Sequence, residues 1–276
     1  MVAYRAILDV PAELVAYLAG LLADERRARG TRAGTRALSC WRQAVFALVW
    51  FRERRPVPLV GEGLGISQAT SYRYLAEAIE VLAAQAPDLH AALRRVADAG
   101  WSHVVLDGKV FDCDRLAETK TSKKGKPVDA WYSGKSSGFG GNIQAVMRPD
   151  GLPVWVSDVE PGSTHDLTAA RTHVLAALYW AASQLRLPTL ADGGYRGAGI
   201  GVHTPVPAPA DGRQLDPDTA ARNLLLRSLR CRGERGFALL AGRWRTLQHI
   251  TASPRAISHI AKAALVLTHF EHDYLA

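Results

Sequence analysis

The chain has 276 residues, of which 48% are hydrophobic and 22% charged, an ordinary balance for a globular protein with a substantial core. Its formal net charge of +8 favours a polyanionic partner, although net charge alone does not identify one. The apolar runs are too short to span a bilayer, and no basic segment leads into an apolar stretch at the N-terminus. We therefore expect neither a membrane protein nor an exported one.

The cysteines are few and widely separated. Cys40, Cys113 and Cys231 form no CxxC pair, which argues against a disulfide framework and against a zinc ribbon. A reduced compartment, the cytoplasm, is therefore expected.

The first 100 residues are predicted to form an all-α domain. The segment ELVAYLAGLLADERRARG places Leu14, Leu18, Leu21 and Leu22 on one helical face. The segment WRQAVFALVWFRER predicts a second, more buried helix, which the Pro-rich stretch beginning at Pro56 ends.

Residues 59–83 have the layout of a helix-turn-helix, the central part of a motif that we place at about 38–84. A short helix over 59–64 is followed by a turn at Gly65, and Ser67 is a good N-cap for a second helix. The second helix has one apolar stripe, formed by Tyr72, Leu75, Ile79 and Leu82. Its N-terminal end carries the polar candidates for major-groove contact, which are Gln68, Thr70, Ser71 and Arg73. The alternative is a helical bundle whose polar face is simply solvated.

From about residue 101 to 276 the pattern predicts a mixed sheet flanked by helices. HVVLDGKVFDCD is a predicted strand, and a Pro-Asp-Gly turn joins two further strands over 140–162. A helix over DLTAARTHVLAALYWAASQL, a short strand at LPTLAD, a helix from about 217 to 242 and a last helix complete the order.

Two aspartates stand where apolar strands lose their hydrophobic character, the place where open α/β sheets build sites. Asp107 follows HVVL and Asp192 follows PTLA, and each is followed by glycine. Asp-Gly is also common in turns, so a turn remains the alternative for either residue alone.

Glu234 is the only acid among seven arginines between Arg222 and Arg245. An exposed ion pair with Arg230 would explain it without any function. Gly233 and Gly236, however, weaken a helix and allow close approach of another backbone or a ligand. A lone carboxylate in a basic helix suits a site that holds metal ions while arginines hold phosphates.

Three converging carboxylates would repel one another unless a cation neutralises them. Mg²⁺ accepts one or two protein carboxylates together with water and phosphate oxygens, and Mn²⁺ has similar preferences. Two such ions about 4 Å apart can support an in-line displacement at phosphorus.

Short motifs in a fixed order carry a family resemblance. After the helix-turn-helix come LDG at 106–108, YSGK at 132–135, NIQAV at 142–146 and VSDVEPGSTHDLTAAR at 156–171. LADGGYRGAG at 190–199 and RGERGFALLAGRWRTL at 232–247 complete the series. In this order the motifs resemble a bacterial insertion-sequence transposase of the DDE type, in the group related to Harbinger-like transposases.

The resemblance implies a ribonuclease H-like catalytic domain whose acids are Asp107, Asp192 and Glu234. It implies a DNA transposase that binds the terminal inverted repeats of its element, cleaves DNA strands and transfers them to a target. The implied partners are double-stranded DNA and, when two ends are synapsed, a second copy of the chain. No membrane and no nucleotide cofactor are implied, and the protein would act at the bacterial nucleoid.

Several other residues are candidates for supporting roles. His165 and Asp166 in STHD could assist beside the metal ions, whereas a capping box with Ser163 as N-cap would explain the same letters. A lysine-rich segment could form an arm on DNA or a solvated loop; it contains Lys120, Lys123, Lys124, Lys126 and Lys135. Arg243 and Arg245 could contact DNA, and Trp244 could be either core or a base-stacking wedge.

Two rival functions remain open at this stage. A DNA-binding regulator derived from a transposase would need the helix-turn-helix and the basic surface but not three acids. A metal-dependent nuclease would cut DNA without joining it.

Overall fold

The computed structural model describes residues 7–122 and 125–275, and for Glu234 it describes the backbone alone. The chain divides into two compact units, and both are discontinuous in sequence. Unit 1 takes residues 1–86, 240–248 and 259–276, and unit 2 takes residues 87–239 and 249–258. This division differs from a single boundary near residue 100, because the C-terminal helices contribute residues to both units.

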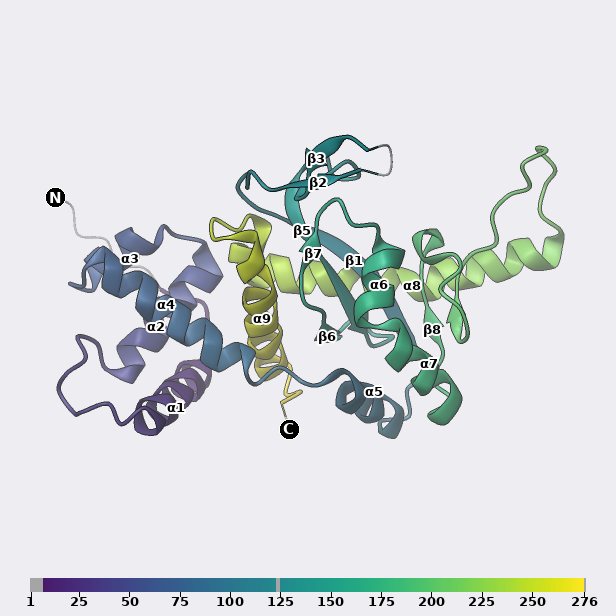
Figure 1. Ribbon diagram of the computed structural model, residues 1–276. Helices are drawn as coiled ribbons and strands as arrows, with labels where there is room; N and C mark the ends of the chain where they lie inside the picture. Colours follow the sequence, from purple (N-terminus) through teal and green to yellow (C-terminus); the bar gives the residue numbers. More distant parts are fainter. Residues whose placement is uncertain (1–6, 123–124, 276) are drawn as a thin grey trace. The chain divides into compact units, whose positions relative to one another are not determined.

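Unit 1 is helical throughout its described part (Figure 1). Its N-terminal helices are α1 (Ala12–Ala28), α2 (Cys40–Glu53), α3 (Val57–Gly63) and α4 (Gln68–Ala83). To these the C-terminal segments add the end of α8 (Pro217–Arg243), the short helix η2 (Arg245–Gln248) and most of α9 (Ile257–Glu271). The first two predicted helices are therefore confirmed, with Leu14, Leu18 and Leu22 buried as expected.

The α3–α4 pair begins its second helix where the sequence predicts it. Gly65 adopts a φ of 72° between the helices, and the Ser67 hydroxyl accepts a hydrogen bond from the Thr70 N–H. The predicted apolar stripe is wrong by one position at its start, since Tyr72 is 50% exposed. Ser71 is fully buried instead, against Gly61, where a Cβ would clash with the serine hydroxyl. The small pair lets α3 and α4 approach closely.

Because Ser71 is buried between these helices, our prediction that it contacts DNA is wrong. Gln68 and Arg73 are exposed, and Thr70 is half-buried beside Ser67. These three remain candidates for groove contact.

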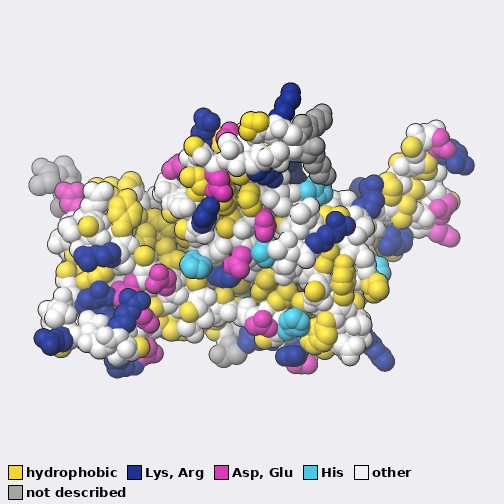
Figure 2. Space-filling model, viewed as in Figure 1, with side chains coloured by type: hydrophobic (Ala, Val, Ile, Leu, Met, Phe, Trp, Pro, Cys, Tyr) yellow, Lys and Arg dark blue, Asp and Glu magenta, His cyan; other side chains and the backbone are white. Residues whose placement is uncertain are grey.

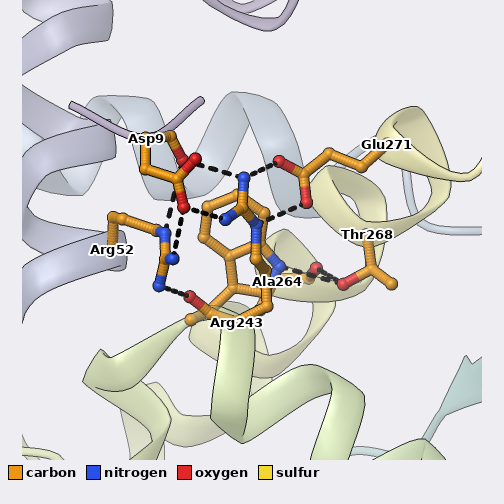
Figure 3. A network of polar contacts seen from close by, with 7 residues as sticks. Asp9, Arg52, Arg243, Ala264, Thr268 and Glu271 are labelled. Atoms are coloured by element: carbon orange, nitrogen blue, oxygen red, sulfur yellow. Dashed lines mark hydrogen bonds and ion pairs between the residues drawn. The ribbon is translucent and has the colours of Figure 1, made fainter. Parts of the chain in front are cut away.

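Arg243 lies at the centre of a polar network in unit 1 (Figure 3). Its guanidinium donates to both carboxylate oxygens of Glu271 at 2.5 and 2.7 Å, and to Asp9 at 2.7 and 2.8 Å. Arg52 donates to the same Asp9 carboxylate and to the Arg243 carbonyl. Trp244, next in the chain, is fully buried and donates its indole N–H to Thr268. Trp244 is therefore a core residue rather than a base-stacking wedge.

Unit 2 is built on a mixed sheet in the order β4-β5-β1-β8-β9, with β6 and β7 also pairing β5 (Figure 1). Its strands are β1 (Val104–Asp112), β4 (Tyr132–Ser133), β5 (Gly138–Met147), β6 (Pro153–Val156), β7 (Glu160–Pro161), β8 (Thr189–Leu190) and β9 (Val202–His203). β1 is antiparallel to β5 but parallel to β8, and β8 is parallel to β9. A separate hairpin pairs β2 (Thr119–Thr121) with β3 (Pro127–Asp129).

The predicted strand–turn–strand over 140–162 is confirmed by the antiparallel pairing of β5 with β6. The helix predicted over 166–185 is two helices, α6 (Asp166–His173) and α7 (Leu175–Gln184). The break falls at Val174, whose φ of −134° lies outside the helical range. Together with α5 (Leu89–Asp98) and the first part of α8, these helices flank the sheet of unit 2.

α8 packs on the sheet through the two glycines that the sequence singled out. A Cβ at Gly233 would clash with Val105 of β1, and one at Gly236 would come within 2.5 Å of the Met147 sulfur of β5. The glycines therefore provide the close approach that their cost in a helix suggested. Among the helices in the described ranges, none is both long and apolar enough to cross a membrane.

Candidate active site

Asp107 lies on β1, and Asp192 follows the neighbouring strand β8 in the sheet of unit 2. β1 and β8 are parallel and pair Val105 with Leu190, so each aspartate stands two residues beyond this pair. The predicted strand over residues 103–114 is confirmed, since β1 runs from Val104 to Asp112 with Asp107 inside it. The first buried run of β1 ends at Leu106, just beyond the residues paired with β8, and the strand is buried again at Phe111.

Asp107 is directed toward α8. Side chains two residues apart on a strand share a face, so Asp107 is on the face of Val105, which contacts Gly233 of α8. The positive charge of Arg230, also on α8, acts on the Asp107 carboxyl. Glu234 follows Gly233 in the same helix, but its side chain lies outside the described part of the structure.

Burial raises the pKa of Asp107 from its usual 3.8 to about 6. The negative charges of Asp192 and Asp166 contribute to this rise in pKa, whereas the Gly108 N–H and Arg230 oppose it. The sequence offered no signal for this shift. A carboxyl held in its charged form at such a place needs a cation beside it.

Asp192 begins a short helical turn, η1 (Gly193–Tyr195), and its carboxylate accepts a hydrogen bond of 2.8 Å from the Gly194 N–H. The turn interpretation of Asp192 is therefore correct as a description of the backbone. It does not exclude a ligand role, because a carboxylate oxygen can accept more than one bond.

The opposite face of β1 carries a buried polar network that sequence reasoning missed. Tyr195 donates to Gln144 at 2.6 Å, Gln144 donates to Asn142 at 2.8 Å, and Asn142 donates to Asp166 at 2.8 Å. Burial raises the pKa of the Tyr195 phenol, which keeps it a neutral donor. The four residues come from η1, β5 and α6, so the network ties three elements together behind the site.

Gly108 is required by this network. A Cβ at Gly108 would lie 2.5 Å from the Gln144 amide nitrogen, 2.7 Å from Asp166 and 2.8 Å from the Tyr195 hydroxyl. The glycine after Asp107 therefore serves close packing within a strand rather than a turn.

Asp166 also binds Lys135, which comes from the turn between β4 and β5. The Lys135 ammonium donates to the second Asp166 oxygen at 2.8 Å. The predicted capping box is wrong in its N-cap: His165 is the N-cap of α6, and its ring accepts from the Leu167 N–H. Ser163 instead donates its hydroxyl to the Ala130 carbonyl.

A pocket of about 460 Å³ opens between these elements. Its lining includes the candidate residues Lys135, Asn142, His165, Asp166 and Asp192. The pocket therefore joins the Asp192 strand end to the residues of the STHD segment.

The other basic candidates are spread over both units. Figure 2 shows Lys and Arg side chains on the β2–β3 hairpin and along the projecting part of α8. Lys120 and Lys126 are exposed on the hairpin, whereas Lys123 and Lys124 lie outside the described residues. Arg245 is exposed, unlike Arg243 with its ion pairs. Asp112 and Asp114 are exposed.

Comparison with known families gives one match. The model of the DDE superfamily endonucleases matches residues 106–269, which is more than half of the chain. The chain belongs to this family. Neither the curated proteins nor the solved structures compared with this endonuclease include a significant match.

Membership gives the endonuclease its substrate, DNA, and agrees with the acids brought together by β1 and β8. DDE-type endonucleases generally use divalent metal ions. Within the described residues, no group of three His, Cys, Asp or Glu side chains is arranged to hold a metal ion. Asp107 and Asp192 nevertheless fit one, because Mg²⁺ is commonly held by one or two carboxylates and keeps several waters.

Proposed function

We propose that this endonuclease is a DNA transposase that binds the terminal inverted repeats of its element, cleaves the strands and joins them to target DNA. The observation that carries the proposal is the parallel pairing of β1 with β8 in a DDE-family chain, because Asp107 and Asp192 each stand two residues beyond the paired Val105 and Leu190. A ribonuclease H-like fold for unit 2 is supported by β1 lying between antiparallel β5 and parallel β8.

In this proposal Asp107, Asp192 and Glu234 hold Mg²⁺ or Mn²⁺, two ions being the number that suits in-line displacement. When bound, such ions would supply the charge that activates an attacking water or 3′-hydroxyl and stabilises the leaving oxygen. Asp107 supplies a carboxylate on the α8 face of the sheet, while the Gly194 N–H orients Asp192. The arginines of α8 attract the phosphates of the strand that is cut.

We propose further that α3 and α4 form a helix-turn-helix that recognises the transposon ends, through Gln68, Thr70 and Arg73. The exposed lysines of the β2–β3 hairpin and Arg245 would add contacts to the DNA backbone. Two copies would act together when two ends are synapsed. The proposed setting is the bacterial cytoplasm at the nucleoid, with Harbinger-like elements as the nearest group.

The test uses DNA carrying the element's ends, with Mg²⁺ or Mn²⁺, and compares four variants. Asp107→Asn, Asp192→Asn and Glu234→Gln should abolish strand cleavage while DNA binding survives. Asp112→Asn is the matched control, because Asp112 is an exposed acid on the same strand as Asp107. Substantial cleavage by any of the three site variants would refute the assignment of these acids.

A second assay separates joining from cutting. With pre-cut ends and a target plasmid, a transposase forms joined products, whereas a nuclease leaves the ends free. A wild-type protein that cuts at the ends but never joins them would replace the proposed function with nuclease activity. Metal-independent binding without any turnover would indicate a regulator.

A further inference from the structure

Lys135 is a positive charge that the structure places beside the acids of the site. Its ammonium donates to Asp166 at 2.8 Å, and both residues line the pocket that Asp192 also lines. The Asp166 contact and the charges of Asp192 and Asp107 raise the pKa of this lysine. Three carboxylates from β1, α6 and the β8–η1 connection thus act on one lysine. A lysine in this position supplies part of the charge that a divalent ion would supply.

The two members of the Lys135–Asp166 pair differ in freedom. Asp166 is nearly buried, and its other oxygen is fixed by Asn142. The Lys135 side chain is 70% exposed and lies on the β4–β5 turn. Because the Asp166 side chain is only 11% exposed, its charge would be costly if left alone, so the lysine can leave only when another cation takes its place.

The hydrogen-bonded network behind Asp166 explains why its carboxylate stays in place when Lys135 moves away. Asn142, Gln144 and Tyr195 form a chain in which each donor has an acceptor. Movement of Asp166 would leave the Asn142 amide without this partner in a buried place, at a cost of about 1–3 kcal/mol. The lysine is therefore the mobile half of the pair.

We propose that Lys135 is a displaceable counter-ion: it occupies the acidic site while no metal is bound, and divalent ions compete with it. The proposal rests on the proposed function, because it takes Asp107 and Asp192 to be the metal-binding acids. Displaced from Asp166, the ammonium becomes free to bind a phosphate of the DNA strand. Metal binding and strand contact are then coupled through one side chain.

The decisive experiment is a titration of the DNA-free full chain with Mn²⁺, followed by electron paramagnetic resonance of the free ion. Lys135→Met keeps the apolar stem and removes the charge, so it should bind Mn²⁺ about three- to tenfold more tightly than wild type. Lys135→Arg keeps the charge and should bind like wild type. Lys126→Met is the control, because it removes an exposed lysine charge from the β2–β3 hairpin.

The outcomes separate this proposal from the function on which it rests. If wild type and all variants bind no Mn²⁺ while Asp107→Asn also leaves DNA cleavage unchanged, the metal site itself is refuted. If wild type binds Mn²⁺ but Lys135→Met binds it equally or less tightly, the counter-ion role alone is refuted. Equal tightening by Lys126→Met would show a general charge effect and would overturn the specific role of Lys135.

Discussion

Replacing Asp107 by asparagine removes a negative charge that the fold holds in an unfavourable place. Burial raises the pKa of this carboxyl from 3.8 to about 6, a change of about two units. Each unit corresponds to about 1.4 kcal/mol, so the ionised group costs the folded state up to about 3 kcal/mol. Asparagine keeps an oxygen that can accept the Gly108 N–H, as Asp107 does now. We therefore expect Asp107→Asn to be more stable than wild type at pH 8.

The pH dependence gives the sign of the effect. Below about pH 4 the carboxyl is protonated in both the folded and the unfolded chain, and the two proteins should be equally stable. Between about pH 4 and 6 the unfolded chain ionises first, so wild type loses stability relative to the variant. Above the folded pKa of about 6 the difference is complete and constant.

The assay is urea unfolding in the presence of EDTA at pH 4, 6 and 8, monitored by circular dichroism. The free energy of unfolding of unit 2 is compared between wild type and variant. Asp112→Asn is the control, since it removes an exposed charge from the same strand. Adding Mg²⁺ should stabilise wild type by mass action but should stabilise Asp107→Asn much less. A variant that is no more stable than wild type at pH 8, without metal, would refute the argument that the fold buries an unfavourable charge.

Two further pairs of substitutions test the packing and the basic residues. Gly108→Ala should destabilise the protein by about 2–3 kcal/mol in urea unfolding and reduce cleavage, because its Cβ would lie within 2.8 Å of three polar atoms. Gly20→Ala, in open space on α1, should instead stabilise by about 0.5–1 kcal/mol, and equal effects would contradict the packing argument. Arg243→Ala should lower the stability of unit 1 by about 2 kcal/mol or more, because it leaves the Glu271 carboxylate, which is 13% exposed, without this partner. The salt dependence of DNA binding should change little. Arg245→Ala should leave the stability of the protein nearly unchanged and should reduce the slope of DNA affinity against salt concentration by about one unit. A reduced slope for Arg243→Ala, with unchanged stability, would make Arg243 the DNA contact.

The elements that could be predicted from sequence were those with strong local signals. Ser67 as an N-cap, the Pro-Asp-Gly turn and the glycines of α8 each act on their own neighbourhood. The apolar and β-branched residues around Asp107 gave the position of β1, which the structure confirms over Val104–Asp112. Periodicity failed at Tyr72, because the contact with Gly61 favours a serine on the buried face.

The parts that could not be predicted depend on contacts between distant segments. Tyr195 and Gln144 are 51 residues apart, and neither carries a motif that announces a hydrogen bond. Arg243 has the composition of a DNA-contacting residue, yet its partner Asp9 is 234 residues away. The sequence gives the charge of Arg243, whereas only the fold decides that an acid of the same chain neutralises it.

The discontinuity of unit 1 has a consequence for how the protein is made. Phe51 of α2 packs against Trp244, and Tyr17 of α1 packs against Phe270 of α9. During synthesis the first helices leave the ribosome long before these partners exist, at about 5–20 residues per second. Their apolar faces must wait about ten seconds or longer for the last residues, so the helical unit closes only after nearly the whole polypeptide has been translated.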